Sequence, residues 1–323
     1  MRTIIFHGGG FGDFFVCFKA LFAIKQLYPQ DRLIAYHAGI ERAFMQKVGF
    51  IDELIDLNEV SLEQVRAIKP DVFITAQRSG AFFRRLKKLG FKKIVVQPHF
   101  VSVTSRAFTT PMPYFRGKKY MADIHLKLVR AINPKHYDAN IGKIDFSRMG
   151  DFLPRDESLV RPFLQSVNFP YKKLIAINAF SNFKESLGLN FFPKDWIRIA
   201  FELARMHPEF LFVLVNFKRN VVQFNINETQ NVVFTNSDSI AFLTSLSAHY
   251  DYLITIDTGA VHLCSVLQVP CFVLTEKVAK YRFCDVAGGG GTPFVVAPGW
   301  QKDYQRVLNA FIAGASKKLG ELA

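Results

Sequence analysis

Short apolar runs alternate with amphipathic stretches along the first half of the chain. Runs of three or four apolar residues predict buried strands, and apolar positions spaced three or four apart predict helices. The expected strands are 3–6, 33–36, 54–57, 72–74 and 94–96. The expected helices are about 13–28, 40–48, 61–68, 79–89 and 119–132. Strands that alternate with helices in short units predict a parallel sheet with helices on both faces.

The alternation breaks between about 145 and 170, where Pro154, Pro162 and Pro170 and mixed charges predict a linker. It then restarts, with strands expected at 174–177, 210–215, 232–234, 252–256 and 271–274. Helices are expected from 193, at 239–248, after 257 and at about 302–319, and 288–291 is expected to be a flexible glycine loop.

These elements predict an α/β fold of two Rossmann-like, doubly wound domains that face a central cleft. The first domain is placed at 1–155 and the second at 156–323, and the last helix is a candidate for packing back on the first domain. Ligands of such sheets bind beyond the carboxyl ends of the strands.

Composition places the chain among globular proteins, because 50% of its residues are hydrophobic and only 21% are charged. No apolar run is long enough for a spanning helix, and the first residues predict a strand rather than a signal peptide. Its four cysteines form no C-x-x-C pair, so we expect reduced core thiols in a cytoplasmic protein and no cysteine metal site.

The formal charge of +14 is concentrated in the first half of the chain. Residues 1–150 hold 24 Lys and Arg against 12 Asp and Glu, which gives +12, and 78–130 hold 13 bases against one acid. Such a field attracts a polyanion: a nucleic acid, a phospholipid surface or a phosphorylated glycolipid. The alternative is a solvated basic surface that keeps the protein soluble.

A glycine-rich turn, His7-Gly8-Gly9-Gly10-Phe11-Gly12-Asp13, follows the first expected strand. Glycines allow a sharp turn and close approach of a ligand, so Gly9, Gly10 and Gly12 are predicted to form a loop of the cleft. The turn fails as a dinucleotide fingerprint, because Asp13 stands where the third glycine belongs. Asp13 is either an acid that only caps the helix or a general base facing the cleft.

A second turn, Asp257-Thr258-Gly259-Ala260, joins a strand abruptly to a helix that contains His262. The amides of Thr258, Gly259 and Ala260, with the Thr258 hydroxyl, are suited to hold a pyrophosphate. His262 either faces the same phosphates or is a buried structural histidine.

A third candidate segment, Ser181-Asn182-Phe183-Lys184, follows the strand expected at 174–177. Lys184 either neutralises a phosphate of the ligand or is a solvated loop lysine.

Together these segments resemble glycosyltransferase family nine, the heptosyltransferases of lipopolysaccharide core assembly. The most specific match is Asp257-Thr258-Gly259-Ala260-Val261-His262, similar to the family's Asp-(Ser/Thr)-Gly-x-x-His signature. The start with Arg2 and Gly12-Asp13, then Tyr28-Pro29, looks like the family's first unit, and 71–79 is similar to its acceptor-side strand and turn.

The resemblance implies the GT-B arrangement, inversion at the anomeric carbon and no metal or other cofactor, with a nucleotide sugar as co-substrate. It implies that Asp13 activates the acceptor hydroxyl. The donor would be bound by Ser181, Asn182, Lys184, Asp257, Thr258, Gly259, Ala260 and His262. The acceptor would be bound by basic residues, for which we name Arg78, Arg84, Arg85, Arg116, Lys118 and Lys119.

The expected function is therefore transfer of heptose from ADP-heptose to the anionic Kdo and lipid A inner core, at the cytoplasmic face of the inner membrane with peripheral contact to its leaflet. No nucleic acid partner is expected, and no protein partner can be inferred.

The segment Asn190-Phe191-Phe192-Pro193 departs from the family, which usually has a lysine three residues before this proline. Lys184 is a candidate replacement for that lysine. Another nucleotide sugar or surface-glycan acceptor, a nucleotide-dependent oxidoreductase and a basic nucleic-acid-binding protein are the alternatives.

Overall fold

The computed structural model describes residues 1–111, 120–179, 190–218, 229–276 and 290–322. Contacts divide the chain into two compact units, Met1–Pro154 and Arg155–Ala323, and the division falls one residue from the predicted boundary. Each unit is built on its own six-stranded sheet, and all strand pairs within these sheets are parallel. We describe the two units separately.

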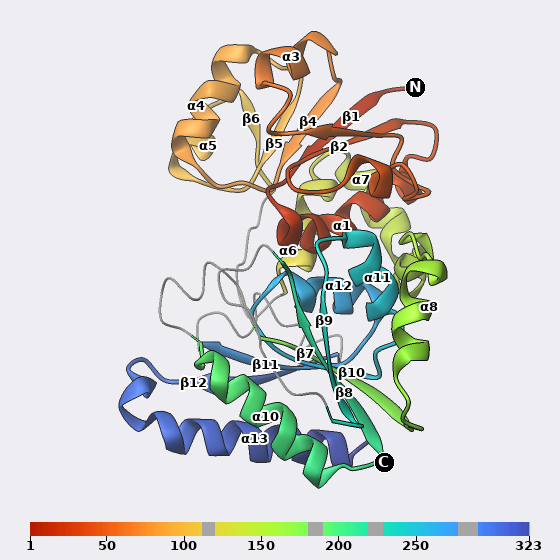
Figure 1. The fold of residues 1–323 in the computed structure, drawn as a ribbon. Helices are drawn as coiled ribbons and strands as arrows, with labels where there is room; N and C mark the ends of the chain where they lie inside the picture. The colour runs from red at the N-terminus through yellow and green to blue at the C-terminus, as the bar shows by residue number, and fades with distance from the viewer. Residues whose placement is uncertain (112–119, 180–189, 219–228, 277–289, 323) are drawn as a thin grey trace. The chain divides into compact units, whose positions relative to one another are not determined.

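The sheet of the first unit has the strand order β3-β2-β1-β4-β5-β6 (Figure 1). Its strands are β1 (Thr3–His7), β2 (Arg32–His37), β3 (Glu53–Asp56), β4 (Val72–Thr75), β5 (Ile94–Val96) and β6 (Phe108–Thr109). The central strands are apolar almost throughout because helices cover both faces of the sheet. The strand order reverses between β1 and β4, so the chain leaves these two neighbours toward opposite faces.

Two groups of helices cover the faces of this sheet (Figure 1). One face carries α3 (Leu62–Ala67) and α4 (Gly80–Leu89), whose Leu62, Val65, Phe83 and Leu86 share a core with the strands. The 17-residue α1 (Phe11–Leu27) packs along α6 (Met121–Arg130) and α7 (Pro134–Asn140). The remaining elements are α2 (Arg42–Met45), α5 (Phe100–Val103), η1 (Ile141–Lys143) and η2 (Phe146–Phe152).

The sheet of the second unit has the order β12-β11-β10-β7-β8-β9. Its strands are β7 (Lys173–Asn178), β8 (Phe210–Asn216), β9 (Val232–Asn236), β10 (Tyr252–Ile256), β11 (Cys271–Glu276) and β12 (Gly291–Val296). Its helices are α8 (Glu157–Ser166), α10 (Pro193–Met206), α11 (Ile240–Ser247), α12 (Gly259–Leu267), η3 (Trp300–Asp303) and α13 (Tyr304–Gly320). The final helix α13 lies beside α10 and buries Leu308 and Phe311 in the core of its own unit (Figure 1).

The segment 145–170, predicted as a linker, contains the division between the two units but is not irregular. Most of that segment is helical: η2 contacts α1, and α8 packs against α11. Pro162 lies inside α8, and Val160 of that helix is completely buried. Pro162 is the sixth residue of α8, where it removes one backbone hydrogen bond, so the helix forms in spite of this residue. Gly291, expected in a loop, begins β12.

Three of the four cysteines, Cys17, Cys264 and Cys271, are buried free thiols, as expected, and Cys284 lies outside the described residues. Among the described helices, none combines the length and apolar character needed to cross a bilayer.

Three histidines of the first unit, His7, His37 and His125, are each at most 3% exposed. Burial lowers their pKa values to about 4 for His7 and His125 and to about 3 for His37. In an unfolded chain a histidine binds its proton near pH 6.5. Between pH 6.5 and about 4 the unfolded state therefore binds more protons than the folded state, and the free energy of unfolding falls as the pH falls.

We expect the free energy of unfolding to be lower at pH 5 than at pH 7, because each of these histidines contributes up to about 1.4 kcal/mol per pH unit. Urea unfolding at several pH values measures this slope. His125→Gln should reduce the slope, whereas His136→Gln, at a residue that reaches solvent, is the matched control. A free energy of unfolding that is the same at pH 5 and pH 7 would contradict the prediction.

Candidate functional site

The first candidate region lies where β1 and β4 end and the chain diverges to the two faces of the sheet. His7 and Thr75 are direct partners at this end of the two strands, and His7 Nδ1 lies 2.8 Å from Thr75 Oγ1. The glycine-rich turn follows His7, and the segment containing Arg78 follows Thr75. Both sequence-predicted segments of the first unit therefore start at the same point of the sheet.

Two glycines of this turn, Gly8 and Gly9, lie against side chains of the protein itself. The Gly8 amide donates to the Tyr36 carbonyl, and a Cβ at Gly8 would lie 1.9 Å from Cε1 of His37. A Cβ at Gly9 would lie 1.9 Å from Oδ2 of Asp13. Gly10, by contrast, has open space at its Cβ position, and Gly12 lies in the first turn of α1. The turn thus brings its backbone directly against the Asp13 carboxyl.

Asp13 occupies the third position of α1 and is exposed to solvent. Its Oδ2 accepts a hydrogen bond of 3.2 Å from the Gly10 amide, as expected for an acid that caps its own helix. Partial desolvation of the carboxyl raises its pKa, and this effect exceeds the opposite effect of the Gly10 hydrogen bond. A carboxyl with a raised pKa is a stronger base than an ordinary aspartate, so capping and general-base catalysis are compatible roles.

The second candidate region lies at the corresponding point of the other sheet, where β7 and β10 end. Thr255 and Asn178 are direct partners there, and the Thr255 hydroxyl donates to the Asn178 carbonyl at 2.7 Å. Thr258 caps α12, and its hydroxyl accepts from the Ala260 amide at 3.3 Å. The amides of Thr258 and Gly259 stand at the start of the helix, where no preceding turn supplies carbonyl partners.

Asp257, Thr258 and Gly259 are partly exposed, whereas Ala260 and His262 are buried. His262 is only 6% exposed. The turn therefore presents backbone amides and one hydroxyl to a ligand.

The third predicted segment, Ser181, Asn182 and Lys184, lies outside the described residues. Asn190, the next described residue, donates from Nδ2 to the Ala179 carbonyl at 2.7 Å, and its Oδ1 accepts from Trp196 Nε1 at 2.9 Å. The residue at the position of the family's usual lysine therefore joins the end of β7 to α10, a structural role that the motif comparison missed.

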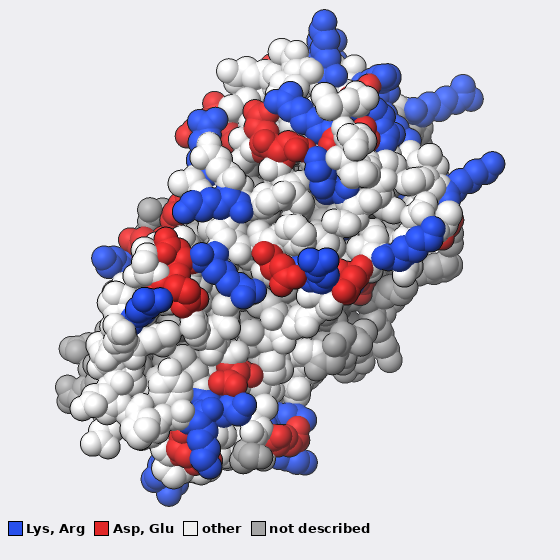
Figure 2. All heavy atoms as spheres, turned by 90° about the vertical axis from the view of Figure 1, so that its right-hand side faces the viewer, with Lys and Arg blue, Asp and Glu red and all other residues white. Residues whose placement is uncertain are grey.

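The predicted acceptor residues are only partly brought together. Arg78 and Arg84 are exposed, whereas Arg85 forms an ion pair with Glu63, with Nη2 2.8 Å from Oε2. Arg116, Lys118 and Lys119 lie outside the described residues. On the face drawn in Figure 2, basic side chains alternate with acidic ones. The charge excess of the sequence is thus partly neutralised by local pairs.

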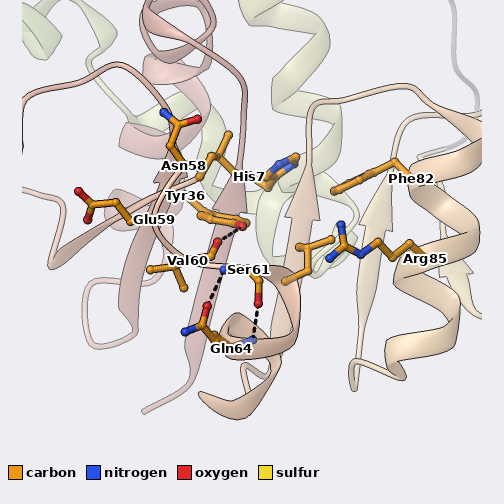
Figure 3. Close-up of a pocket in the computed structure, with 11 residues that line it drawn as sticks. His7, Tyr36, Asn58, Glu59, Val60, Ser61, Gln64, Phe82 and Arg85 are labelled. Atoms are coloured by element: carbon orange, nitrogen blue, oxygen red, sulfur yellow. Dashed lines mark hydrogen bonds between the residues drawn. The ribbon is translucent and has the colours of Figure 1, made fainter.

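Sequence reasoning missed a cavity of about 430 Å³ in the first unit (Figure 3). It is lined by His7, Tyr36, Leu57, Asn58, Glu59, Val60, Ser61, Leu62, Gln64, Phe82 and Arg85. The one available signal was a histidine at the end of an otherwise apolar strand, and it could not indicate which distant residues would surround it.

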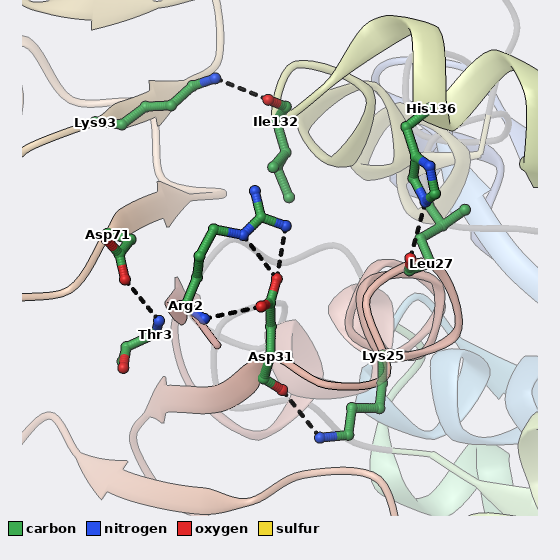
Figure 4. Close-up of polar contacts among 9 residues, drawn as sticks. All are labelled: Arg2, Thr3, Lys25, Leu27, Asp31, Asp71, Lys93, Ile132 and His136. Carbon is green, nitrogen blue, oxygen red and sulfur yellow. Dashed lines mark hydrogen bonds and ion pairs between the residues drawn. The ribbon is translucent and has the colours of Figure 1, made fainter.

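The start of the chain, part of the family resemblance, has a structural role (Figure 4). The Asp31 carboxylate accepts hydrogen bonds from the backbone amide of Arg2 at 2.9 Å and from its guanidinium at 2.6 and 2.8 Å. The same guanidinium lies over the Tyr28 ring, 4.7 Å from its centroid. Burial alone would raise the pKa of Asp31, but the contacts with Arg2 outweigh it and lower the pKa. This part of the family resemblance therefore reflects how β1 and β2 begin.

No group of three histidine, cysteine, aspartate or glutamate side chains in the described part of the chain could hold a metal ion.

Comparison with known proteins gives results for structure but not for sequence. No protein-family model matches the chain, and no curated protein matches its sequence. A family 9 glycosyl transferase from Veillonella parvula shares the fold with a TM-score of 0.63 at 15% identity, covering 95% of this chain and 89% of that one. ADP-heptose lipopolysaccharide heptosyltransferase II of E. coli has a TM-score of 0.63 at 12% identity, covering 98% and 99%.

A third solved structure, E. coli heptosyltransferase WaaC with ADP-2-deoxy-2-fluoro heptose, has a TM-score of 0.57 at 13% identity and covers 93% of this chain and 94% of that one. The chain thus has the two-domain α/β fold found in these glycosyltransferases. The predicted fold class and the resemblance to family nine are confirmed at the level of the fold.

We expect Gly9→Ala to displace the Asp13 carboxyl, because the new Cβ would meet Oδ2. Loss of the Gly10 hydrogen bond should raise the pKa of Asp13, which carbon-detected NMR titration of the carboxyl measures. Gly10→Ala is the control, since its Cβ has open space. Equal Asp13 pKa values in the wild-type protein and in Gly9→Ala would show that the glycine does not position the carboxyl.

Proposed function

We propose that this chain is a glycosyltransferase that takes its sugar from a nucleotide sugar. The observation that carries the proposal is the fold, which the chain shares over 98% of its length with a heptosyltransferase and over 93% with one bound to an ADP-heptose analogue. The position of the two turns adds support, because each starts where the strand order of a doubly wound sheet reverses. Such points are where these sheets bind ligands.

The donor diphosphate is assigned to the turn after β10. Negative charge grows on the departing diphosphate during transfer, and helix-start amides fixed in place stabilise it without reorganising. Thr258 and Gly259 supply these amides, and Lys184 supplies a positive charge. Transfer in this proposal inverts the anomeric carbon and needs no metal ion.

Asp13 is assigned as the base that removes the proton from the acceptor hydroxyl. Its exposure lets a substrate reach the carboxyl, and its raised pKa favours proton uptake. The favoured donor is ADP-heptose, and the favoured acceptor is the Kdo-bearing lipid A core, with Arg78 and Arg84 among the residues that contact its anionic groups. The enzyme would act at the cytoplasmic face of the inner membrane.

A thermal-shift series with ADP-heptose, other nucleotide sugars and NADH tests the donor class, since a ligand of the folded state raises the melting temperature. We expect ADP-heptose to give the largest shift. Gly259→Val should weaken nucleotide binding at least about tenfold by blocking close approach to the amides. The control Gly10→Ala should leave nucleotide affinity unchanged. A shift with NADH and none with any nucleotide sugar would refute the proposal.

We expect Asp13→Asn to lower turnover by roughly 10²-fold or more, because an amide cannot act as a general base. The amide oxygen can still accept from the Gly10 amide, so the melting temperature and donor affinity should change little. In the wild-type enzyme the acidic limb of kcat/KM should have an apparent pKa above the ordinary aspartate value. Near-normal turnover of folded Asp13→Asn would leave Asp13 with the capping role alone.

A further inference from the structure

The cavity of the first unit is built by four separate stretches of the fold (Figure 3). His7 and Tyr36 come from the carboxyl ends of β1 and β2, Asn58 to Ser61 form the approach to α3, and Phe82 and Arg85 come from α4. Its volume of about 430 Å³ lies within the range of about 300–1,000 Å³ that is usual for small-molecule sites. It lies at the carboxyl edge of the sheet from which the turn to Asp13 also starts.

His7 presents a neutral nitrogen at this cavity. The Thr75 hydroxyl oxygen accepts from the Gln77 amide at 3.0 Å, so its own proton is available for His7 Nδ1. Thr75 is completely buried, and this assignment satisfies its hydroxyl. The proton of the imidazole is then on Nε2, which has no hydrogen-bond partner among the described residues. A pKa of about 4, caused by burial, keeps the ring uncharged at neutral pH.

Aromatic rings form one wall of the cavity. Phe82 stacks on His7, with the ring centroids 4.8 Å apart. The centroid of the Tyr36 ring lies 5.2 Å from that of His7. Figure 3 shows Phe82 reaching from α4 toward His7. The His7–Phe82 stack is already closed, so a planar base cannot insert between these two rings. Phe82 is only half-buried, and its remaining surface is available to the apolar face of a ligand.

The charges around the cavity nearly cancel. Arg85 is paired with Glu63, and Glu59 on the opposite side is exposed. These three residues sum to one negative charge, in contrast to the basic segment in which Arg85 lies. A phosphate or carboxylate placed here would be repelled by Glu59, and Glu63 already offsets the charge of Arg85. Amide and hydroxyl groups of Asn58, Ser61 and Gln64 complete the rim.

We propose that this cavity binds an uncharged pyranose ring of the acceptor, an inference that rests on the proposed function. A pyranose has an apolar face of C–H groups for Phe82 and a rim of hydroxyls that both donate and accept. Asn58 and Glu59 accept from such hydroxyls, and the Nε2–H of His7 donates to them. The anionic groups of the acceptor then lie outside the cavity, and the ring held in the cavity is a neutral sugar of that acceptor rather than Kdo.

Saturation-transfer NMR on the full chain tests the proposal with methyl glucoside, methyl mannoside, methyl glucuronide, glucose 6-phosphate and adenosine as probes. We expect the neutral glycosides to bind and the two acidic sugars to bind no more tightly. Phe82→Ala should weaken glycoside binding roughly tenfold through loss of an aromatic contact. Asn58→Ala, at an exposed residue, should also weaken it without disturbing the fold. Lys87→Ala is the control, because Lys87 is exposed on the same helix and does not line the cavity.

The proposal is overturned if no neutral glycoside binds the wild-type protein, or if binding is unchanged in both Phe82→Ala and Asn58→Ala. Tenfold tighter binding of an acidic sugar, or displacement of the glycoside by adenosine, also overturns it. Thermal shifts with nucleotide sugars on the same samples keep the two proposals apart. Nucleotide-sugar binding without glycoside binding refutes the cavity assignment alone, and glycoside binding without nucleotide-sugar binding refutes the transferase function.

Discussion

The fold of each unit depends on how two neighbouring parallel strands separate at the point where the strand order reverses. The chain leaves the two strands in opposite directions there. The last polar groups of the strands therefore have no further strand-to-strand hydrogen bonds and need other partners. In the first sheet His7 and Thr75 meet across this point, and in the second Thr255 donates to the Asn178 carbonyl. Both are contacts between directly opposite residues, and a side-chain pair in one sheet and a side-chain-to-backbone bond in the other meet the same geometrical need.

The candidate chemistry follows from this constraint. A loop that leaves such a point must turn at once. In the first unit, the His37 ring occupies the space where a Cβ of Gly8 would lie. The Asp13 carboxyl occupies the corresponding space at Gly9. Glycine is therefore required whether or not a ligand approaches. The glycine-rich motif alone could not distinguish a binding loop from a packing requirement. The exposed carboxyl of Asp13, whose pKa is raised by desolvation, is the feature that favours chemistry.

The sequence predicted most of the strands because buried parallel strands are continuous apolar runs. It missed β6, which has two residues, and β12, which contains Pro293 and follows glycines. A linker was predicted where the structure has α8, because the prolines of this segment are typical of an irregular connection. The apolar spacing that buries Val160 is the signal that indicated a helix. The cavity could not be predicted at all, since His7, Tyr36, Asn58 and Phe82 are far apart in sequence and meet only through the strand order.

The sequence and the structure differ most in the distribution of charge. The segment 78–130 has a large formal excess of bases, but Arg85 pairs with Glu63, Lys92 with Asp71 and Arg130 with Asp138. All three acidic partners come from outside the segment. Exposed pairs of this kind contribute little to the stability of a fold, so their main effect is on the local field. Arg78 and Arg84 are charged and exposed at the surface, whereas the charges around the nearby cavity almost cancel. One acceptor can therefore place its acidic groups near these arginines and an uncharged ring in the cavity.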